Sequence, residues 1–320
     1  MTTPPPNRPY QNVHRFAVFT AACTFLLLIA GALVTSNDAG LSVPDWPLSY
    51  GSLTPPMVGG IFYEHGHRMI ASFVGLLSIA LAVWLWRVES RRPASERPPV
   101  KGSLRWLGVA ALGAIVAQGL LGGLTVLFFL PPSVSSAHAT LAQLFFATVA
   151  SIALLTSAWW EREPVSWFRD PRSPSIHALA LAAVAAVFLQ LILGAAFRHK
   201  AFGIIPHLAG AVVVTGLIFW LAGALRRRFP AVPELRFAAR ALHILIGLQL
   251  LLGAAAWWSR LYAASFPQPI AVTVALTVAH VVLGALVLVS TVLVTLVCYR
   301  LVRPAGAIVG SPAPRPSTAD

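Results

Sequence analysis

The chain has 320 residues, of which 57% are hydrophobic and only 10% are charged, and its formal net charge is +13. A soluble domain of this size would carry about a quarter charged residues, so the composition excludes a soluble globular protein and indicates an integral membrane protein. The basic residues lie mostly in short segments between apolar runs and not on one continuous face. This distribution excludes nucleic acid as a partner and favours a role in membrane topology.

Long apolar runs recur along the whole chain, and each is close to the length of about 20 residues that crosses a bilayer as a helix. Their many glycines and alanines favour closely packed membrane helices, and their weak alternation argues against a membrane β-barrel. We therefore expect an all-α integral membrane protein. Its eight predicted transmembrane helices lie near residues 16–35, 68–86, 106–129, 138–158, 175–197, 206–225, 238–258 and 270–299.

Basic residues gather in alternate connections between these helices. The other connections are poor in them: segment 36–66 contains no Lys or Arg, and connection 130–137 contains no charged residue. Cytoplasmic loops of membrane proteins are enriched in Lys and Arg, so the basic connections are expected inside and both termini in the cytoplasm. The basic connections are 87–105, 162–172 and 226–240.

An internal repeat divides the chain. The stretches "QGLLGGLTV" (118–126), "QLILGAAFR" (190–198) and "QLLLGAAAW" (249–257) each place Gly four residues after Gln near the outer end of a predicted helix. The first helix has the related "FLLLIAGALVTS" without the Gln. These features predict two pseudo-symmetric four-helix bundles, an N-terminal half over 1–165 and a C-terminal half over 166–320.

Each predicted even-numbered helix opens with a histidine. These histidines are at positions 67, 138, 207 and 280. The two histidines within each half are 71 (138 − 67) and 73 (280 − 207) residues apart, and equivalent histidines of the two halves are 140 (207 − 67) and 142 (280 − 138) residues apart. One histidine near a helix end more often bonds a backbone group, but matching positions in a repeat favour a shared function. Two imidazoles facing each other across a helix bundle are suited to hold a heme iron from both sides. The four histidines, His67, His138, His207 and His280, therefore predict two heme-sized sites; zinc is disfavoured because no Cys, Asp or Glu cluster completes a four-ligand set.

The two predicted sites differ in their flanking residues. Glu64 precedes His67 by three positions and Arg68 follows it, whereas the second half has "IIPHLAG" around His207. A carboxylate at membrane depth is costly and suggests function, although Glu64 as an exposed loop charge is the alternative. The asymmetry predicts a reaction site in the first half and a fixed redox centre in the second.

The motif "GALVTSNDAGLSVPDWPLSYG" (31–51), together with Glu64, His67, Arg68 and the three later histidines, resembles the heme A synthase family across all predicted helices. The resemblance implies oxidation of the C8 methyl group of heme O to a formyl group, with water as the oxygen source. It implies a heme b cofactor with His207 and His280 as axial ligands. It also implies a substrate heme site with His67, His138 and Arg68, and Glu64 as the catalytic residue. Some bacterial members carry a cysteine pair in an outer loop, which this chain lacks.

Several assignments remain open at this stage. Glu64 is suited either to act as a general base on water or to stabilise a cationic intermediate. The outer-loop cations are suited to contact heme propionates, and ordinary solvation is an equally good interpretation. His65 lies on a different helix face from His67, and Trp46 in the first outer loop is either an interfacial anchor or a substrate contact. The outer-loop cations are Arg198, Lys200 and Arg260.

The expected partners follow from the same resemblance. Heme O is the expected substrate, heme O synthase a candidate protein partner, and the membrane electron acceptor is not identified by the sequence. We expect a multi-pass protein of a bacterial plasma membrane, with the heme sites toward the extracytoplasmic side. The alternatives are a diheme b-type cytochrome that only transfers electrons, and a heme carrier.

Overall fold

The computed structural model describes residues 10–91, 103–162 and 167–304. In this part of the chain, eight helices are long and apolar enough to cross a membrane, which confirms the predicted multi-pass all-α fold. They are α1 (Gln11–Ser36), α2 (Gly59–Ser90), α3 (Ser103–Leu127), α4 (Pro132–Leu155), α6 (Ile176–Arg198), α7 (Ile205–Arg228), α8 (Pro233–Ala263) and α9 (Ala271–Leu301).

Several helices begin before the apolar runs that predicted them. Hydropathy marks only the apolar residues, whereas the backbone continues its helical hydrogen bonds through polar residues at the bilayer surface. Helix α2 starts at Gly59 and not near residue 68, so Glu64 is helical. Pro132 and Pro233 occupy the first turns of α4 and α8, where the missing N–H has no intrahelical partner to lose.

A small element that the sequence did not predict joins two ends of the second half. Strands β1 (Phe168–Asp170) and β2 (Val302–Pro304) pair in parallel, with Phe168 opposite Val302. These strands have three residues each, too few to give an alternation signal. The Asp170 carboxylate accepts the Ile176 N–H at 2.6 Å and pairs with Arg228 at 3.0 Å, which fixes the start of α6.

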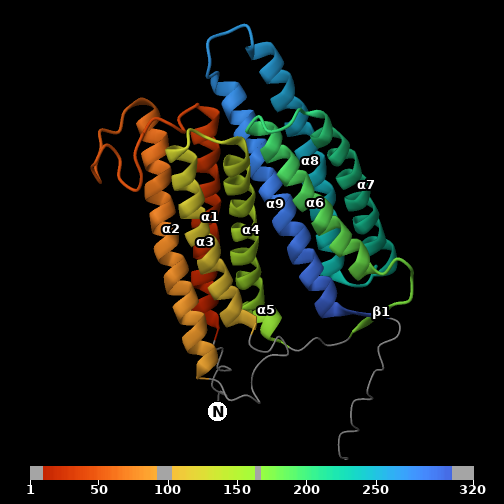
Figure 1. Cartoon of the computed structure of the whole chain (residues 1–320). Coiled ribbons are helices and arrows are strands. Elements are labelled where there is room, and N and C mark those ends of the chain that lie inside the picture. The colour runs from red at the N-terminus through yellow and green to blue at the C-terminus, as the bar shows by residue number, and fades with distance from the viewer. Residues whose placement is uncertain (1–9, 92–102, 163–166, 305–320) are drawn as a thin grey trace, which may run out of the picture.

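The long helices form two groups with the same pattern of neighbours. Helix α1 packs on α2 and α4, and α3 packs on the same two helices; α6 packs on α7 and α9, and α8 does likewise. Between the groups, α4 contacts α6 and α9, and α1 contacts α9 (Figure 1). A duplicated four-helix unit would produce this pattern, while the pseudo-symmetry and the boundary at residue 165 stay predictions.

Apolar side chains fill both groups and the seam between them. One cluster belongs to α1–α4 and includes Leu27, Val74 and Phe145. The larger cluster belongs to α6–α9 and takes in Leu28 and Phe146 from the first group. Because lipid is as apolar as these side chains, packing and not hydrophobicity holds such helices together.

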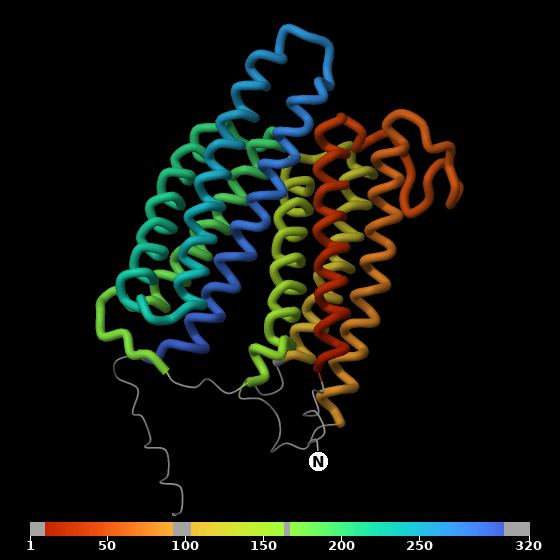
Figure 2. Tube along the Cα trace, turned by 180° about the vertical axis from the view of Figure 1, so that it is seen from behind, coloured from red at the N-terminus to blue at the C-terminus, as the bar shows by residue number. Residues whose placement is uncertain are grey.

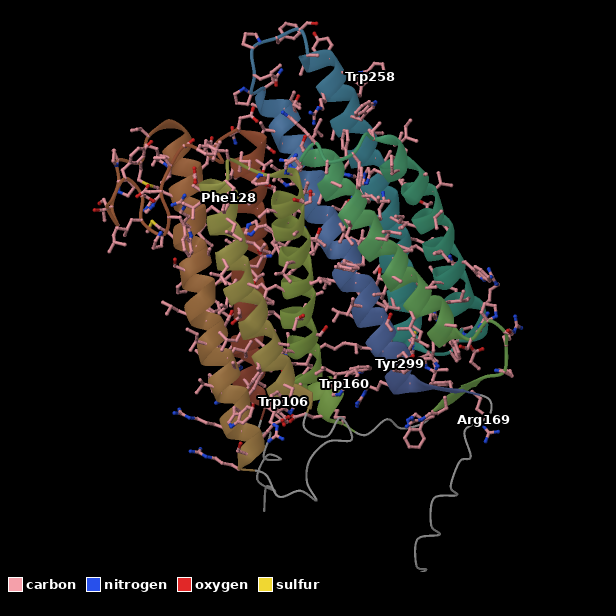
Figure 3. All side chains as sticks on the ribbon, viewed as in Figure 1. Trp106, Phe128, Trp160, Arg169, Trp258 and Tyr299 are labelled. Carbon is pink, nitrogen blue, oxygen red and sulfur yellow. The ribbon has the colours of Figure 1, made fainter. Side chains whose placement is uncertain are left out.

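The described ends of the chain, at the start of α1 and after α9, lie at the same end of the molecule (Figure 1). The predicted cytoplasmic placement of the termini themselves falls on residues outside the described ranges. Trp106 and Trp160 lie toward this end, while Phe128 and Trp258 lie toward the opposite end (Figure 3). At that opposite end, the hairpin of α8 and α9 extends beyond the other helices (Figure 2). A small helix, α5 (Ala158–Glu161), follows α4.

Candidate functional site

Each of the four repeat histidines lies against a glycine of the preceding long helix. A methyl carbon added to the glycine would come within 3.0 Å of His67 Cε1, 3.3 Å of His138, 3.0 Å of His207 and 2.8 Å of His280. A side chain at the glycine would press on the imidazole ring at all four positions, most strongly at Gly253, where the ring or the helix would have to move. The pairs are Gly31 with His67, Gly122 with His138, Gly194 with His207 and Gly253 with His280.

The glutamines of the repeat reach the same histidines. Gln118 Nε2 donates to the His138 backbone carbonyl, and Gln190 Nε2 to the His207 backbone carbonyl, both at 2.8 Å. Gln190 Nε2 is also 3.1 Å from His207 Nδ1. The third glutamine, Gln249, lies with its amide nitrogen 3.5 Å from His280 Nε2. Each Gln and Gly pair therefore forms a seat for one histidine.

The rings of His207 and His280 have a geometry that fits a heme iron between them. Their centroids are 6.2 Å apart and their planes are 87° apart. An iron bonded to one nitrogen of each ring at about 2 Å would separate the ring centres by roughly 6 Å. The Nδ1 atom of His280 is buried without a hydrogen-bond partner among the described residues, and buried polar atoms usually have one. These residues fit a bis-histidine heme.

The first group holds the other two seats, those of His67 and His138. The Nδ1 atoms of both rings are buried and have no hydrogen-bond partner within the described ranges. In the part of the chain that the structure covers, no three His, Cys, Asp or Glu side chains come together as a metal-binding group. Among those residues, the seats thus offer imidazoles without a third His, Cys, Asp or Glu side chain for a metal ion.

Glu64, which is buried, and Arg68, which is partly buried, form an ion pair at the start of α2, and both bind the first outer loop. Glu64 is 4% exposed. Its Oε1 accepts from Arg68 Nη2 at 2.6 Å, and its Oε2 accepts from the Val43 N–H at 2.8 Å. Arg68 Nη1 donates to the backbone carbonyls of Asp45 at 2.8 Å and Leu48 at 2.9 Å. The exposed-charge alternative for Glu64 is wrong, because both carboxylate oxygens are engaged beneath the loop.

The first outer loop, residues 37–58, is fixed to α3 as well as to α2. The Trp46 ring lies against Gly123, where an added methyl carbon would be 2.7 Å from the ring. Gly123 is next to Gly122, which seats His138. Gly40 meets the Leu130 side chain in the same way, at 3.3 Å. The loop thus caps the end of the first group beside the His138 seat, and Trp46 contacts protein at 38% exposure.

His65 and Asp45 complete the attachment of this loop. His65 is 7% exposed, and its Nδ1 shares a hydrogen bond of 2.8 Å with Ser49 Oγ. Asp45 accepts the N–H groups of Tyr50 and Gly51 at 2.7 and 2.8 Å. These backbone donors, Gly51 foremost, hold the pKa of Asp45 below its usual value. His65 is therefore a loop anchor, a role that its face of the helix did not reveal.

The outer-loop cations have different surroundings. Arg198 Nη2 donates to Ser36 Oγ at 2.7 Å and to the Ala32 carbonyl at 3.3 Å, which joins the end of α6 to the end of α1. Lys200 and Arg260 are exposed. Burial lowers the pKa of His199 to about 4, with the charge of Arg198 adding to the effect, so His199 is neutral at pH 7. The propionate contacts stay a prediction for all three cations.

The remaining helix histidines bind backbone carbonyls far from the seats. His14 Nδ1 is 2.8 Å from the Ala153 carbonyl, and His243 Nδ1 is 2.8 Å from the Ala239 carbonyl. His177 Nε2 is 3.3 Å from the Cys298 carbonyl, and its ring stacks on Tyr299 with centroids 4.3 Å apart. These contacts account for three polar side chains within apolar helices.

Sequence reasoning missed the purpose of the glutamines and glycines. Their spacing was visible as a repeat, but only the fold brings each Gln and Gly onto the histidine of the following helix. The signal that could have identified them is the recurrence of Gln, then Gly four positions later, then His after the outer turn.

The chain is similar to proteins of one family along most of its length. A family model described as "Cytochrome oxidase assembly protein" matches residues 14–60 and 57–298. A relative named heme A synthase, from Shouchella clausii, is 29% identical over 59% of this chain and 60% of its own length. Another of that name, from Symbiobacterium thermophilum, is 32% identical over 56% of each chain. The matched part thus spans somewhat under two thirds of these relatives.

Proposed function

The chain belongs to the cytochrome oxidase assembly protein family, and from this premise we propose that it is a heme A synthase that oxidises the C8 methyl group of heme O to a formyl group. Relatives named heme A synthase support the activity. The observation that carries the proposal is the set of four seated histidines, two in each helix group. Water supplies the oxygen, and the electrons removed from the methyl carbon pass to a membrane acceptor.

The two halves have different tasks in this proposal. His207 and His280, in the half over 166–320, hold heme b as axial ligands, and their ring separation of 6.2 Å supports this. When bound, heme b supplies a one-electron redox centre. His67 and His138, in the half over 1–165, bind the iron of heme O. The heme sites lie toward the extracytoplasmic side of a bacterial plasma membrane, because the basic connections lie at the other end.

The residues around His67 make the first half the reaction site. The buried Glu64 carboxylate lies one turn before His67 on the same helix, beneath the first outer loop. A carboxylate in such a place is suited to take a proton from water or to stabilise positive charge on the substrate. Arg68 holds that carboxylate by an ion pair of 2.6 Å. Arg198, Lys200 and Arg260 are the candidate propionate contacts, with heme O synthase as the candidate partner that delivers substrate.

The test is extraction and mass analysis of heme from membranes of a host that makes heme O but no heme A, with and without this protein. We expect a new heme bearing a formyl group only when the protein is present. The matched control is the His67→Ala variant, expressed to the same level. Heme b alone, with heme O unchanged, would overturn the proposal in favour of an electron-transfer cytochrome.

A further inference from the structure

Three of the four histidine seats contain a glutamine, and one does not. At the position that Gln118, Gln190 and Gln249 occupy on their helices, four residues before the seat glycine, α1 has Leu27 before Gly31. Leu27 is 9% exposed and packs in the apolar cluster of the first group, to which Ile70 and Ala71 of α2 also belong. His67 is thus the one repeat histidine that faces a side chain without hydrogen-bonding groups.

The glutamine amides are placed to fix their histidines. Two of them donate to the backbone carbonyl of the histidine at 2.8 Å. The Oε1 atoms of all three are buried without a hydrogen-bond partner among the described residues. The Nδ1 atoms of His138 and His280 are buried and unpartnered in the same part of the chain. Each of these glutamines therefore has a spare acceptor in the seat of its histidine.

Space for these amides is provided on the second group's facing helices. A methyl carbon on Gly210 would lie 2.1 Å from Gln190 Oε1, and one on Gly284 would lie 3.3 Å from Gln249 Nε2. These glycines follow His207 by three residues and His280 by four. The corresponding positions after His67 hold Ile70 and Ala71. The second group is therefore built around its glutamines on both helices.

The seat of His67 differs in having no amide, and the polar group that α1 offers its ring is the Leu27 backbone carbonyl. Its Nδ1 has no hydrogen-bond partner within the described ranges, as is also the case for His138 and His280. Outer-shell partners orient a ligand histidine and raise its basicity, and their loss typically weakens metal binding about ten- to a hundredfold. A cofactor site benefits from such a partner on both ligands, whereas a site that must release its product does not.

We infer that the glutamines are positioning residues for three firmly held axial histidines, and that Leu27 makes His67 the exchangeable ligand through which substrate iron is bound and product iron released. This inference rests on the proposed function, because it presumes a resident heme in the second group and a transient one in the first. It assigns the exchange step to one ligand of one site.

The experiment measures heme loss from the purified full chain in lipid nanodiscs. The protein is loaded with heme b, heme O is added as the probe for the first site, and apomyoglobin in excess captures released heme. Wild type should show low-spin bis-histidine absorption that decays in a fast phase, from the first site, and a slow phase, from the second. Extraction of the captured heme at each time point assigns the phases to heme O and heme b.

The decisive variant is Leu27→Gln, which supplies the missing amide, with Leu27→Met as the apolar control of similar length. We expect Leu27→Gln to slow the fast phase about tenfold and Leu27→Met to leave it unchanged. In the other site, Gln190→Met should speed the slow phase about tenfold while the fast phase stays as in wild type. This second variant keeps the inference testable if Leu27→Gln does not fold.

Two results would overturn the inference and separate it from the proposed function. Two clear phases in wild type, with rates unaffected by Leu27→Gln and by Gln190→Met, would refute the role of the glutamines and leave the synthase proposal intact. Absence of low-spin heme absorption in wild type would refute the heme sites themselves, and the inference with them.

Discussion

Glu64 combines a possible chemical task with a structural one, because its two oxygens bind Arg68 and the Val43 N–H. The loop over residues 37–58 depends on the same pair, since Arg68 donates to three of its backbone carbonyls. Replacing a residue that serves both tasks changes both. A useful variant must therefore remove the charge of the carboxylate while the loop stays attached.

Glu64→Gln removes the charge while preserving an acceptor for the Val43 N–H. We expect heme A formation to fall about a hundredfold or more, the usual scale for losing an acid–base group, while bound heme b is unchanged. The measurement is heme A yield per protein, together with proteolysis of loop 37–58. Arg68→Lys is the comparison, because it keeps a positive charge but loses the forked contacts to the loop. Normal heme A yield from Glu64→Gln would show that the carboxylate has no chemical role.

At the scale of the helix, a glycine is needed only at the position that faces a histidine ring. Gly253 and Gly247 both lie on α8, but only Gly253 faces a histidine. A methyl carbon on Gly253 would be 2.8 Å from His280 Cε1, whereas one on Gly247 would have no neighbour within 4 Å. The same substitution at these two positions tests the seat without changing the helix.

Gly253→Ala should displace His280 and weaken heme b binding by about 1–3 kcal/mol, the typical cost of overpacking. Gly247→Ala should bind heme b as wild type does and should be slightly more stable, since Ala favours a helix. Titration of the heme-depleted protein with heme b, followed by its absorption, measures both. Equal affinity in the two variants would mean that the ring does not depend on the glycine.

The sequence predicted the features that follow from local composition, and it missed those that depend on contacts between distant segments. The eight spans follow from apolar length alone, and the structure confirms them. The start of α2 was placed about nine residues late because Glu64, His65 and Arg68 interrupt the apolar run that hydropathy detects. Their attachment to loop 37–58, and the attachment of Gln to His, are tertiary contacts between segments that no local pattern relates.

On the scale of the molecule, the two helix groups meet through α1, α4, α6 and α9, and Arg198 adds a buried polar link to Ser36. The proposed division of tasks between the groups is a claim about independent sites. His207→Ala and His280→Ala should each deplete bound heme b, while His67→Ala and His138→Ala should retain it and lose only heme A formation. Heme content of the four purified variants checks this. The same loss of heme b from all four would contradict the division.

The orientation of the molecule is a separate prediction. Ser265, in the turn between α8 and α9, should lie outside the cell, and Pro230, between α7 and α8, should lie inside. A cysteine at each position, in a chain with Cys23 and Cys298 replaced by serine, can be labelled in intact cells with a membrane-impermeant maleimide. Ser265→Cys should react and Pro230→Cys should react only after lysis. The reverse pattern would invert the topology.

The long hairpin of α8 and α9 also affects the surrounding lipid. Each of its helices has 31 residues and is about 46 Å long, whereas α6 and α7 have 23 and 24 residues and are about 35 Å long. The part of α9 from residue 271 to 298 contains no charged residue, and when upright it is longer than a hydrocarbon core of about 30 Å. Tilt of the second group and local thickening of the bilayer relieve this hydrophobic mismatch. The tilt of the second group is therefore expected to depend on the acyl-chain length of the lipid. This is the group that holds His207 and His280.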